Sequence, residues 1–366
     1  MPQTNKITFN NHNKTNITSS TSAAWTLHAT GYPASKMISG HEYFCLAWYN
    51  CFSPGTNEGA TKLAFITGAG GDLVGSVHQR HNTNDSGQYV GHLGQFTAPD
   101  PAAPIGIYRK RMAGGGTERT EYGQFFSIDL SGTGMVESGN WASYTNIATR
   151  TVSSGDNLTS HTLGIDSGTC LIAATCRVYD ATSSNSLVGL YVDDVLRVSG
   201  SRYTQDTSDV QQVLLAGSFN VGSGTTLKLK NIDREGDSIT TSYSYVFALN
   251  MEAAGGSKTG RFTNWTDNTT SGQWGASTIL GKGPSFVFSR GRQIQTGAES
   301  GRPASISVKN ITQNEWMVLP NRPSGDFSPL YFPNTNYGLN TGQLETSLVV
   351  GTGNVQPGDS IGIFTI

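Results

Sequence analysis

Charged residues are scarce in this sequence. They form 14% of its 366 residues, and the formal net charge is -2. A chain with this balance has neither a basic field that would hold nucleic acid nor an acidic tail, so we expect no nucleic-acid partner. No stretch approaches the ~18 apolar residues of a membrane-spanning helix, so we expect no membrane partner either.

A secretion signal is also missing from the start of the sequence. The first residues, MPQTNKITFNNHNKTN, contain no apolar segment of the signal-peptide type. This start predicts a protein that is made in the cytoplasm and is not exported by a Sec-type route.

Glycine and other turn-forming residues, by contrast, are abundant. The chain has 45 glycines, frequent Ser, Thr and Asn, and 10% aromatic residues, which disordered chains lack. Short apolar runs separated by clusters of turn residues predict an all-β fold. The length suits two or three domains of about 100–150 residues.

One opening pattern occurs three times along the chain. It consists of Thr-Asn, an apolar residue, a polar stretch and a short apolar strand that ends at Gly. The copies are KTNITSSTSAAWTLHATG from Lys14, YTNIATRTVSSGDNLTSHTLG from Tyr144 and FTNWTDNTTSGQWGASTILG from Phe262. Their spacing of 130 and 118 residues suits complete β-sandwiches. We therefore predict three tandem β-sandwich domains of the jelly-roll type, near 1–134, 135–255 and 256–366.

A second landmark closes each repeat: a strand, a Pro/Gly turn and a further strand. The copies are HLGQFTAPDPAAPIGIYRKR (His92–Arg111), LLAGSFNVGSGTTLKLKN (Leu214–Asn231) and LVVGTGNVQPGDSIGIFTI (Leu348–Ile366). The first two copies continue into a last strand, YGQFFSIDL and YSYVFALNM. The third does not, so we expect its final strand to be missing or supplied by something else.

The four cysteines form two pairs of equal spacing, CLAWYNC (Cys45–Cys51) and CLIAATC (Cys170–Cys176). Both segments have the pattern of strands, on which residues i and i+6 share a face but lie ~20 Å apart. That distance excludes a disulfide or a shared metal ion within either pair. We expect four free, buried, structural thiols; disulfides between domains are the alternative.

Two motifs suggest cofactors. LAFITGAGGDLVG (Leu63–Gly75) resembles a strand followed by a dinucleotide-binding loop, but no helical pattern follows it. The matching stretch of the second repeat, Leu187–Gly200, predicts a hairpin that turns at Asp193-Asp194. Possible metal ligands gather in one predicted polar loop that has no histidine in its second-repeat counterpart. They are His78, His81, Asp85 and His92. We predict no cofactor and no metal.

Candidate catalytic groups are confined to predicted loops and turns, where a solvated carboxylate is ordinary. The carboxylate sets are Glu118 with Glu121, Asp233 with Glu235 and Asp237, and Asp193 with Asp194. No Gly-x-Ser-x-Gly elbow is present. We therefore predict that the protein is not an enzyme.

The aromatic residues offer candidate contacts for a glycan or a protein partner. Trp48 lies on the opposite face of its strand from Cys45 and Cys51, whereas Trp141 and Trp265 fall at the joins between domains. The residues that we select as glycan or partner contacts are Trp48, Tyr89, Tyr331 and Tyr337.

As a whole, the chain resembles bacteriophage virion structural proteins with tandem jelly-roll domains, such as capsid decoration proteins, head fibres and tail-associated proteins. The resemblance lies in three β units of about 120 residues, low charge, Gly/Ser/Thr/Asn-rich turns and no catalytic motif. It implies a virion location, a homotrimer, and other virion proteins such as the major capsid protein as partners.

Apolar residues on both faces of EYFCLAWYNCF and SYVFALNM agree with this resemblance, because they predict a second face buried against a partner. The N-terminal arm (Met1–Lys14) and the open sheet edge of the third repeat are the candidate docking elements. The alternatives are a carbohydrate- or receptor-binding module of a phage tail or cell-surface adhesin, which would use host-surface glycans, and a polysaccharide-degrading tail protein.

Overall fold

The structure is a computed structural model. It describes residues 9–14, 18–53, 57–66, 71–73, 79–83, 86–113, 118–131, 137, 139–179, 184–204, 211–232, 238–252, 272–278, 283–294, 306–318 and 344–365. Within these ranges the chain is almost entirely β, with one short 3₁₀ turn at Ala34–Lys36. The described part of the chain has no helix of the length and apolarity that crossing a bilayer requires.

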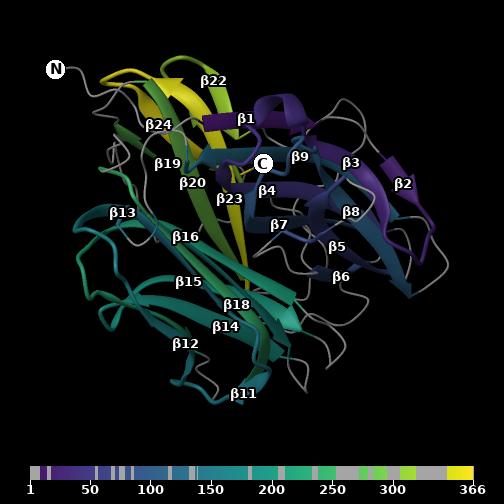
Figure 1. The fold of residues 1–366 in the computed structure, drawn as a ribbon, viewed down its shortest axis with the longest axis horizontal. Coiled ribbons are helices and arrows are strands. Elements are labelled where there is room, and N and C mark those ends of the chain that lie inside the picture. Colours follow the sequence, from purple (N-terminus) through teal and green to yellow (C-terminus); the bar gives the residue numbers. More distant parts are fainter. Residues whose placement is uncertain are drawn as a thin grey trace.

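The first set of strands, unit 1, forms two antiparallel sheets (Figure 1). The inner sheet has the order β1-β9-β4-β7, with β2 beside β9, and the outer sheet has the order β3-β8-β5-β6. The inner strands are β1 (Phe9–Lys14), β2 (Thr18–Ser20), β4 (Glu42–Ser53), β7 (Ser86–Thr97) and β9 (Glu118–Asp129). The outer strands are β3 (Thr26–Tyr32), β5 (Asn57–Phe65), β6 (Gln79–Thr83) and β8 (Ile105–Ala113). Apart from the pairs β1–β2 and β5–β6, successive strands alternate between the two sheets, as in a jelly roll.

Unit 2 repeats this topology strand for strand. Its inner sheet has the order β10-β18-β13-β16, with β11 beside β18, and its outer sheet has the order β12-β17-β14-β15. The inner strands are β10 (Trp141–Asn146), β11 (Arg150–Val152), β13 (Gly168–Tyr179), β16 (Gln211–Val221) and β18 (Ile239–Asn250). The outer strands are β12 (Asn157–Thr162), β14 (Ser184–Val192), β15 (Val195–Thr204) and β17 (Thr226–Asn231).

Unit 3 contains the same outer sheet and part of the inner one. The outer sheet has the order β19-β24-β21-β22, and the inner strands are β20 and β23. The outer strands are β19 (Gly272–Thr278), β21 (Ile306–Asn310), β22 (Glu315–Val318) and β24 (Ser360–Thr365), and the inner strands are β20 (Gly283–Ile294) and β23 (Leu344–Val355). The predicted all-β fold of three jelly-roll-like sandwiches is confirmed. No described sheet mixes strands from two of the predicted segments, whose boundaries stay predictions.

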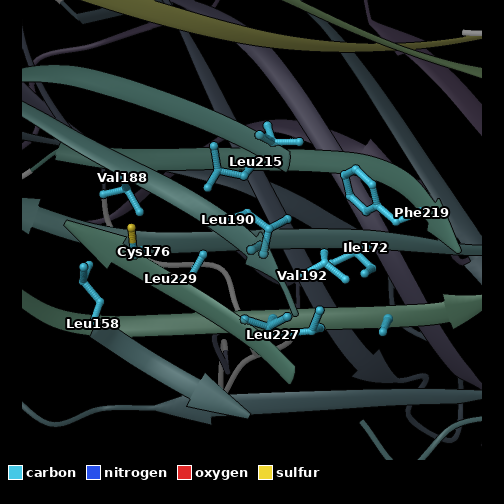
Figure 2. Close-up of a cluster of buried hydrophobic side chains, with 14 of the residues drawn as sticks. Leu158, Ile172, Cys176, Val188, Leu190, Val192, Leu215, Phe219, Leu227 and Leu229 are labelled. Atoms are coloured by element: carbon cyan, nitrogen blue, oxygen red, sulfur yellow. The ribbon is translucent and has the colours of Figure 1, made fainter. Parts of the chain in front are cut away.

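Units 1 and 2 each have an apolar core between their two sheets. Alternate residues of the inner strands point into it, as Cys45 and Ala47 do in unit 1. Figure 2 shows the core of unit 2, which contains Ile172 and Cys176 of the inner sheet together with Leu229 of the outer sheet.

A further apolar cluster lies between the units. Phe44 and Leu46 on the second face of β4 meet Tyr245 and Phe247 on the second face of β18, and the cluster continues into unit 3 at Val355. The rings of Phe44 and Phe247 stack with centroids 3.9 Å apart. Figure 1 shows the three units side by side, and β23 contacts β15 and β16 of unit 2 and β4 and β7 of unit 1.

This cluster corrects the prediction that a partner molecule buries the second face of the strands with apolar residues on both faces. At Phe44 and Leu46 of EYFCLAWYNCF, and at Phe247 and Leu249 of SYVFALNM, this face is buried as expected, but the neighbouring unit of the same chain covers it. Trp141 at the join is 2% exposed and packs near Phe247. The homotrimer stays a prediction, and the apolar second face of these strands no longer supports it.

Candidate functional site

Of the four predicted glycan or partner contacts, the structure describes the strand positions of two, Trp48 and Tyr89. Trp48 in β4 pairs with Gly91, and Tyr89 in β7 pairs with Asn50, so the register puts Trp48 and Tyr89 on one face as diagonal neighbours. Their side chains lie outside the described residues, as do Tyr331 and Tyr337 and the whole segment 326–339.

The cysteines behave as structural residues. Cys45, Cys170 and Cys176 are free and buried in strands β4 and β13, as predicted. Burial raises the pKa of the Cys170 thiol to about 12 and raises the pKa values of Cys45 and Cys176 well above the usual range. Such thiols are inert, because the thiolate is the reactive form. The side chain of Cys51 lies outside the described residues.

Residues 71–73, at the end of the glycine-rich segment, lie back along β5. Ala64 bridges Asp72 in antiparallel sense, and the Leu73 N–H donates to the Leu63 carbonyl at 3.2 Å. This arrangement agrees with the predicted β structure. In unit 2, Asp193 and Asp194 adopt φ values of 48° and 62°, as the predicted two-residue hairpin turn requires.

The histidine-containing segment is not the polar loop that we expected. Gln79–Thr83 and Ser86–Thr97 are strands, and His92 is 1% exposed. The Nε2 atom of His92 lies 3.1 Å from the Thr61 hydroxyl, so this histidine is part of the core of unit 1. His78 and Asp85 lie outside the described residues, as does the side chain of His81. Among the residues that are described, no three potential ligands gather around a metal position.

Among the candidate carboxylate sets, Asp193 and Asp194 are the pair whose side chains the structure describes, and both form hydrogen bonds with neighbouring groups. Asp193 accepts the Thr226 N–H at 2.9 Å, and Asp194 accepts a hydrogen bond from Lys228 at 2.7 Å. The hydrogen bond with Lys228 lowers the pKa of Asp194. Both groups therefore fasten the β14–β15 hairpin to β17. The side chains of Glu118 and Glu121, and residues 233–237, lie outside the description.

The outer sheet of unit 1 holds one indole beside two lysines. Trp25 stands directly before β3, Lys62 lies in β5 and Lys110 lies in the strand between them, β8. The Nζ atoms of Lys62 and Lys110 each lie 4.9 Å from the centre of the Trp25 ring, a favourable cation–π distance. Lys62 also pairs with Asp72 at 2.6 Å, whereas Lys110 has no carboxylate partner within the described residues. We call these four residues the Trp25 cluster.

The other outer sheets contain related pairs. In unit 2 the Nζ of Lys230 lies 4.6 Å from the Tyr191 ring, and in unit 3 the Nζ of Lys309 lies 5.1 Å from the Trp316 ring. Each pair joins a lysine to an aromatic residue of the neighbouring strand. The Trp25 cluster differs because two ammonium groups share one ring. The sequence alone does not single out Trp25, because only the strand register brings Lys62 and Lys110 beside it.

Comparisons with solved structures return distant similarities. PNGF-II aligns with a TM-score of 0.30 and 11% identity, over 62% of this chain and 59% of its own, so the chain spans less than two thirds of that protein. The CBM22-1–CBM22-2 tandem domain of Paenibacillus barcinonensis Xyn10C aligns with a TM-score of 0.22 and 10% identity, over 67% of this chain and 93% of its own. The triple jelly roll of an archaeal virus turret aligns with a TM-score of 0.21 and 9% identity, over 90% of this chain and 78% of its own. Neither the protein-family models nor the curated proteins contain a match.

Proposed function

We propose that the protein is a non-enzymatic structural component of a virus particle, in the manner of a capsid decoration, head-fibre or tail-accessory protein. The observation that supports this role is the apolar cluster that joins three jelly-roll units within one chain. Jelly rolls are a common architecture of viral capsid and lectin domains. A chain that buries its inner faces internally forms one stiff block, which suits a part that must persist outside a cell.

The polar contacts inside the cluster fit this structural role. The Tyr245 hydroxyl donates to the Gln95 side-chain oxygen at 2.9 Å across the boundary between units 1 and 2. The Gln95 amide in turn donates to the Glu42 carboxylate. A satisfied buried polar network fixes one relative orientation of two packed surfaces, because any sliding leaves its members without partners.

The test is whether the protein is present on particles. An antibody against the purified chain should label intact particles. When the purified chain is added to particles that lack it, the two should sediment together at a fixed stoichiometry. Absence from purified particles, or binding without saturation, would refute the role. Light scattering of the free protein decides between a monomer of 38.9 kDa and the predicted homotrimer.

A second candidate function is binding of an acidic saccharide, and the Trp25 cluster is the observation that favours it. An indole provides a face for sugar C–H groups, and the Lys110 ammonium provides a positive charge without a carboxylate partner among the described residues. Binding of glycans that contain uronic or sialic acid, lost in Trp25→Leu and in Lys110→Met, would support it. The matched control is Lys230→Met, which removes a related lysine from the outer sheet of unit 2. Equal binding by all variants would exclude the cluster as the site.

A further inference from the structure

The outer face of unit 1 extends beyond the Trp25 cluster along strand β8. Ile105 and Ile107 of this strand are buried in the core. Gly106, Tyr108 and Lys110 alternate with them and therefore lie in one row on the opposite face. Alternate residues of a strand lie ~7 Å apart, so the row runs ~13 Å from the glycine to the lysine. Different side chains gather at its two ends.

The glycine end of the row is apolar. The side chains of Leu27 and Ile66 meet over Gly106, where an added Cβ atom would clash with Leu27 and lie 2.9 Å from Ile66. Leu27 is nevertheless 40% exposed. The absence of a side chain at Gly106 therefore makes room for an apolar surface that stays open to solvent. We call Leu27 and Ile66 the apolar end.

The lysine end of the row is positively charged. The Nζ atoms of Lys62 and Lys110 lie 4.9 Å from the centre of the Trp25 ring, so both charges gather around one side chain. Asp72 pairs with Lys62 at 2.6 Å. We therefore assign the anionic group of a ligand to Lys110, whose ammonium group the indole holds in place.

Tyr108 lies between the two ends. It pairs with Leu27 of β3 on one side and with Lys62 of β5 on the other. Its hydroxyl donates to the Phe65 carbonyl at 3.4 Å, and the Nζ atom of Lys62 lies 5.8 Å from the centre of its ring. The face thus presents a positive charge, an aromatic ring and an apolar surface in that order.

This order specifies a ligand more closely than its acidity does. A sugar whose carboxylate meets Lys110 lies along Tyr108 and directs a substituent towards Leu27 and Ile66. A hydroxyl group at that position would exchange hydrogen bonds with water for contact with hydrocarbon, which is unfavourable. A methyl group there would be removed from water, which is favourable.

We propose that the outer face of unit 1 is a site for an N-acylated acidic saccharide of the sialic acid type. The carboxylate of the sugar meets Lys110, and the methyl group of its N-acyl substituent lies on Leu27 and Ile66. The proposal rests on the acidic-saccharide function of the Trp25 cluster and narrows it, because simple uronic acids have a carboxylate but no acyl group. It makes the apolar end the part of the site that determines specificity.

Two methyl glycosides of sialic acid test the role of the acyl group. One has the N-acetyl group and the other has a hydroxyl group in its place, so both have the same carboxylate. In NMR titrations of the full chain, the N-acetyl compound should bind about 3- to 10-fold more tightly. N-propanoyl and N-butanoyl analogues should gain about 2- to 4-fold for each added methylene group, because each one extends the contact with the apolar end.

Variants at the two ends of the row locate the acyl group. Leu27→Ser should remove the preference for the N-acetyl compound and leave the affinity for the hydroxyl analogue unchanged, which also shows that the variant is folded. Lys110→Met should weaken both compounds by the same factor. The matched control is Met112→Ser, since Met112 is 45% exposed and lies two residues beyond Lys110 in β8, away from the apolar end. This control should keep the preference.

The outcomes separate this proposal from the function on which it rests. Equal binding of the two glycosides to the wild type, or binding of galacturonic acid alone, would leave the acidic-saccharide function standing and overturn the N-acyl proposal. The proposal is also overturned if Leu27→Ser keeps the preference or if Met112→Ser removes it. If neither the sialic acid glycosides nor galacturonic acid bind, the acidic-saccharide function fails as well.

Discussion

The stacked rings of Phe44 and Phe247 permit a quantitative test of the packing between units 1 and 2. Their centroids lie 3.9 Å apart with an angle of 3° between the planes, and both residues are fully buried. Replacing either one by alanine removes a large buried side chain and leaves a cavity, which costs about 3–5 kcal/mol of unfolding free energy. An aromatic pair adds about 0.5–1.5 kcal/mol beyond its buried area. The double variant should therefore lose less than the two single losses combined, by about that amount.

The measurement is reversible urea unfolding of the wild type, the two single variants and the double variant. Trp141, which lies 6.2 Å from Phe247, provides a fluorescence signal close to the substituted site. Leu190→Ala is the matched control, because Leu190 is buried in the separate core of unit 2. It should cost about 2–5 kcal/mol and be additive with Phe44→Ala to within about 0.5 kcal/mol.

Two results would refute the packing between units. One is additivity of Phe44→Ala and Phe247→Ala to within about 0.5 kcal/mol, which would mean that the rings do not touch. The other is a cost for Phe44→Ala below about 0.5 kcal/mol, as expected for an exposed position. In that event the second face of β4 would be free for another molecule, and the prediction of a partner from the two-faced strands would recover its support.

Three further predictions follow from named contacts. Tyr245→Phe should cost about 1–3 kcal/mol of unfolding free energy, measured in urea, because it leaves the buried Gln95 oxygen without its donor. Burial raises the pKa of Tyr245 well above its usual value, so its phenol remains a hydrogen-bond donor at high pH. Gly91→Val should cost about 1–3 kcal/mol, because even a Cβ at Gly91 would clash with the Leu214 side chain, and Leu214→Ala should relieve most of that loss. The buried thiols should resist a thiol reagent until the chain unfolds. Burial raises the pKa of Cys170 in the folded protein to about 12, whereas a thiol in the unfolded chain has a pKa of about 8.5. The contribution of this buried thiol to stability is therefore complete below pH about 8.5 and should be lost as the pH rises from there towards 12. The measurement is the free energy of unfolding as a function of pH.

The sequence predicted the fold class because alternation and turn residues are local signals. The repeated opening at Lys14, Tyr144 and Phe262 and the strands around Cys45 and Cys170 can be recognised without knowing what packs on what. The assignment of His92 to a polar loop was wrong for the complementary reason. The polar residues around it indicate a loop, whereas its place in β7 is set by pairing with β4, a contact distant in sequence.

What covers a buried face cannot be deduced from an apolar pattern. Phe44 and Leu46 indicate that the second face of β4 avoids water, but a neighbouring unit and a separate subunit satisfy that requirement equally well. The Trp25 cluster was missed for a related reason, since Lys62 and Lys110 are remote from Trp25 in sequence and become its neighbours only through the β3-β8-β5 order.

The internal cluster limits which surfaces remain for assembly. The inner sheets of units 1 and 2 cover each other, so contacts with other molecules are left to the outer sheets and to unit 3. The outer sheets have lysine–aromatic pairs that are stable in water, and such surfaces need no permanent cover. If the chain attaches to a larger structure, we therefore expect the outer sheet of unit 1 to face solvent, where the Trp25 cluster can meet a soluble ligand.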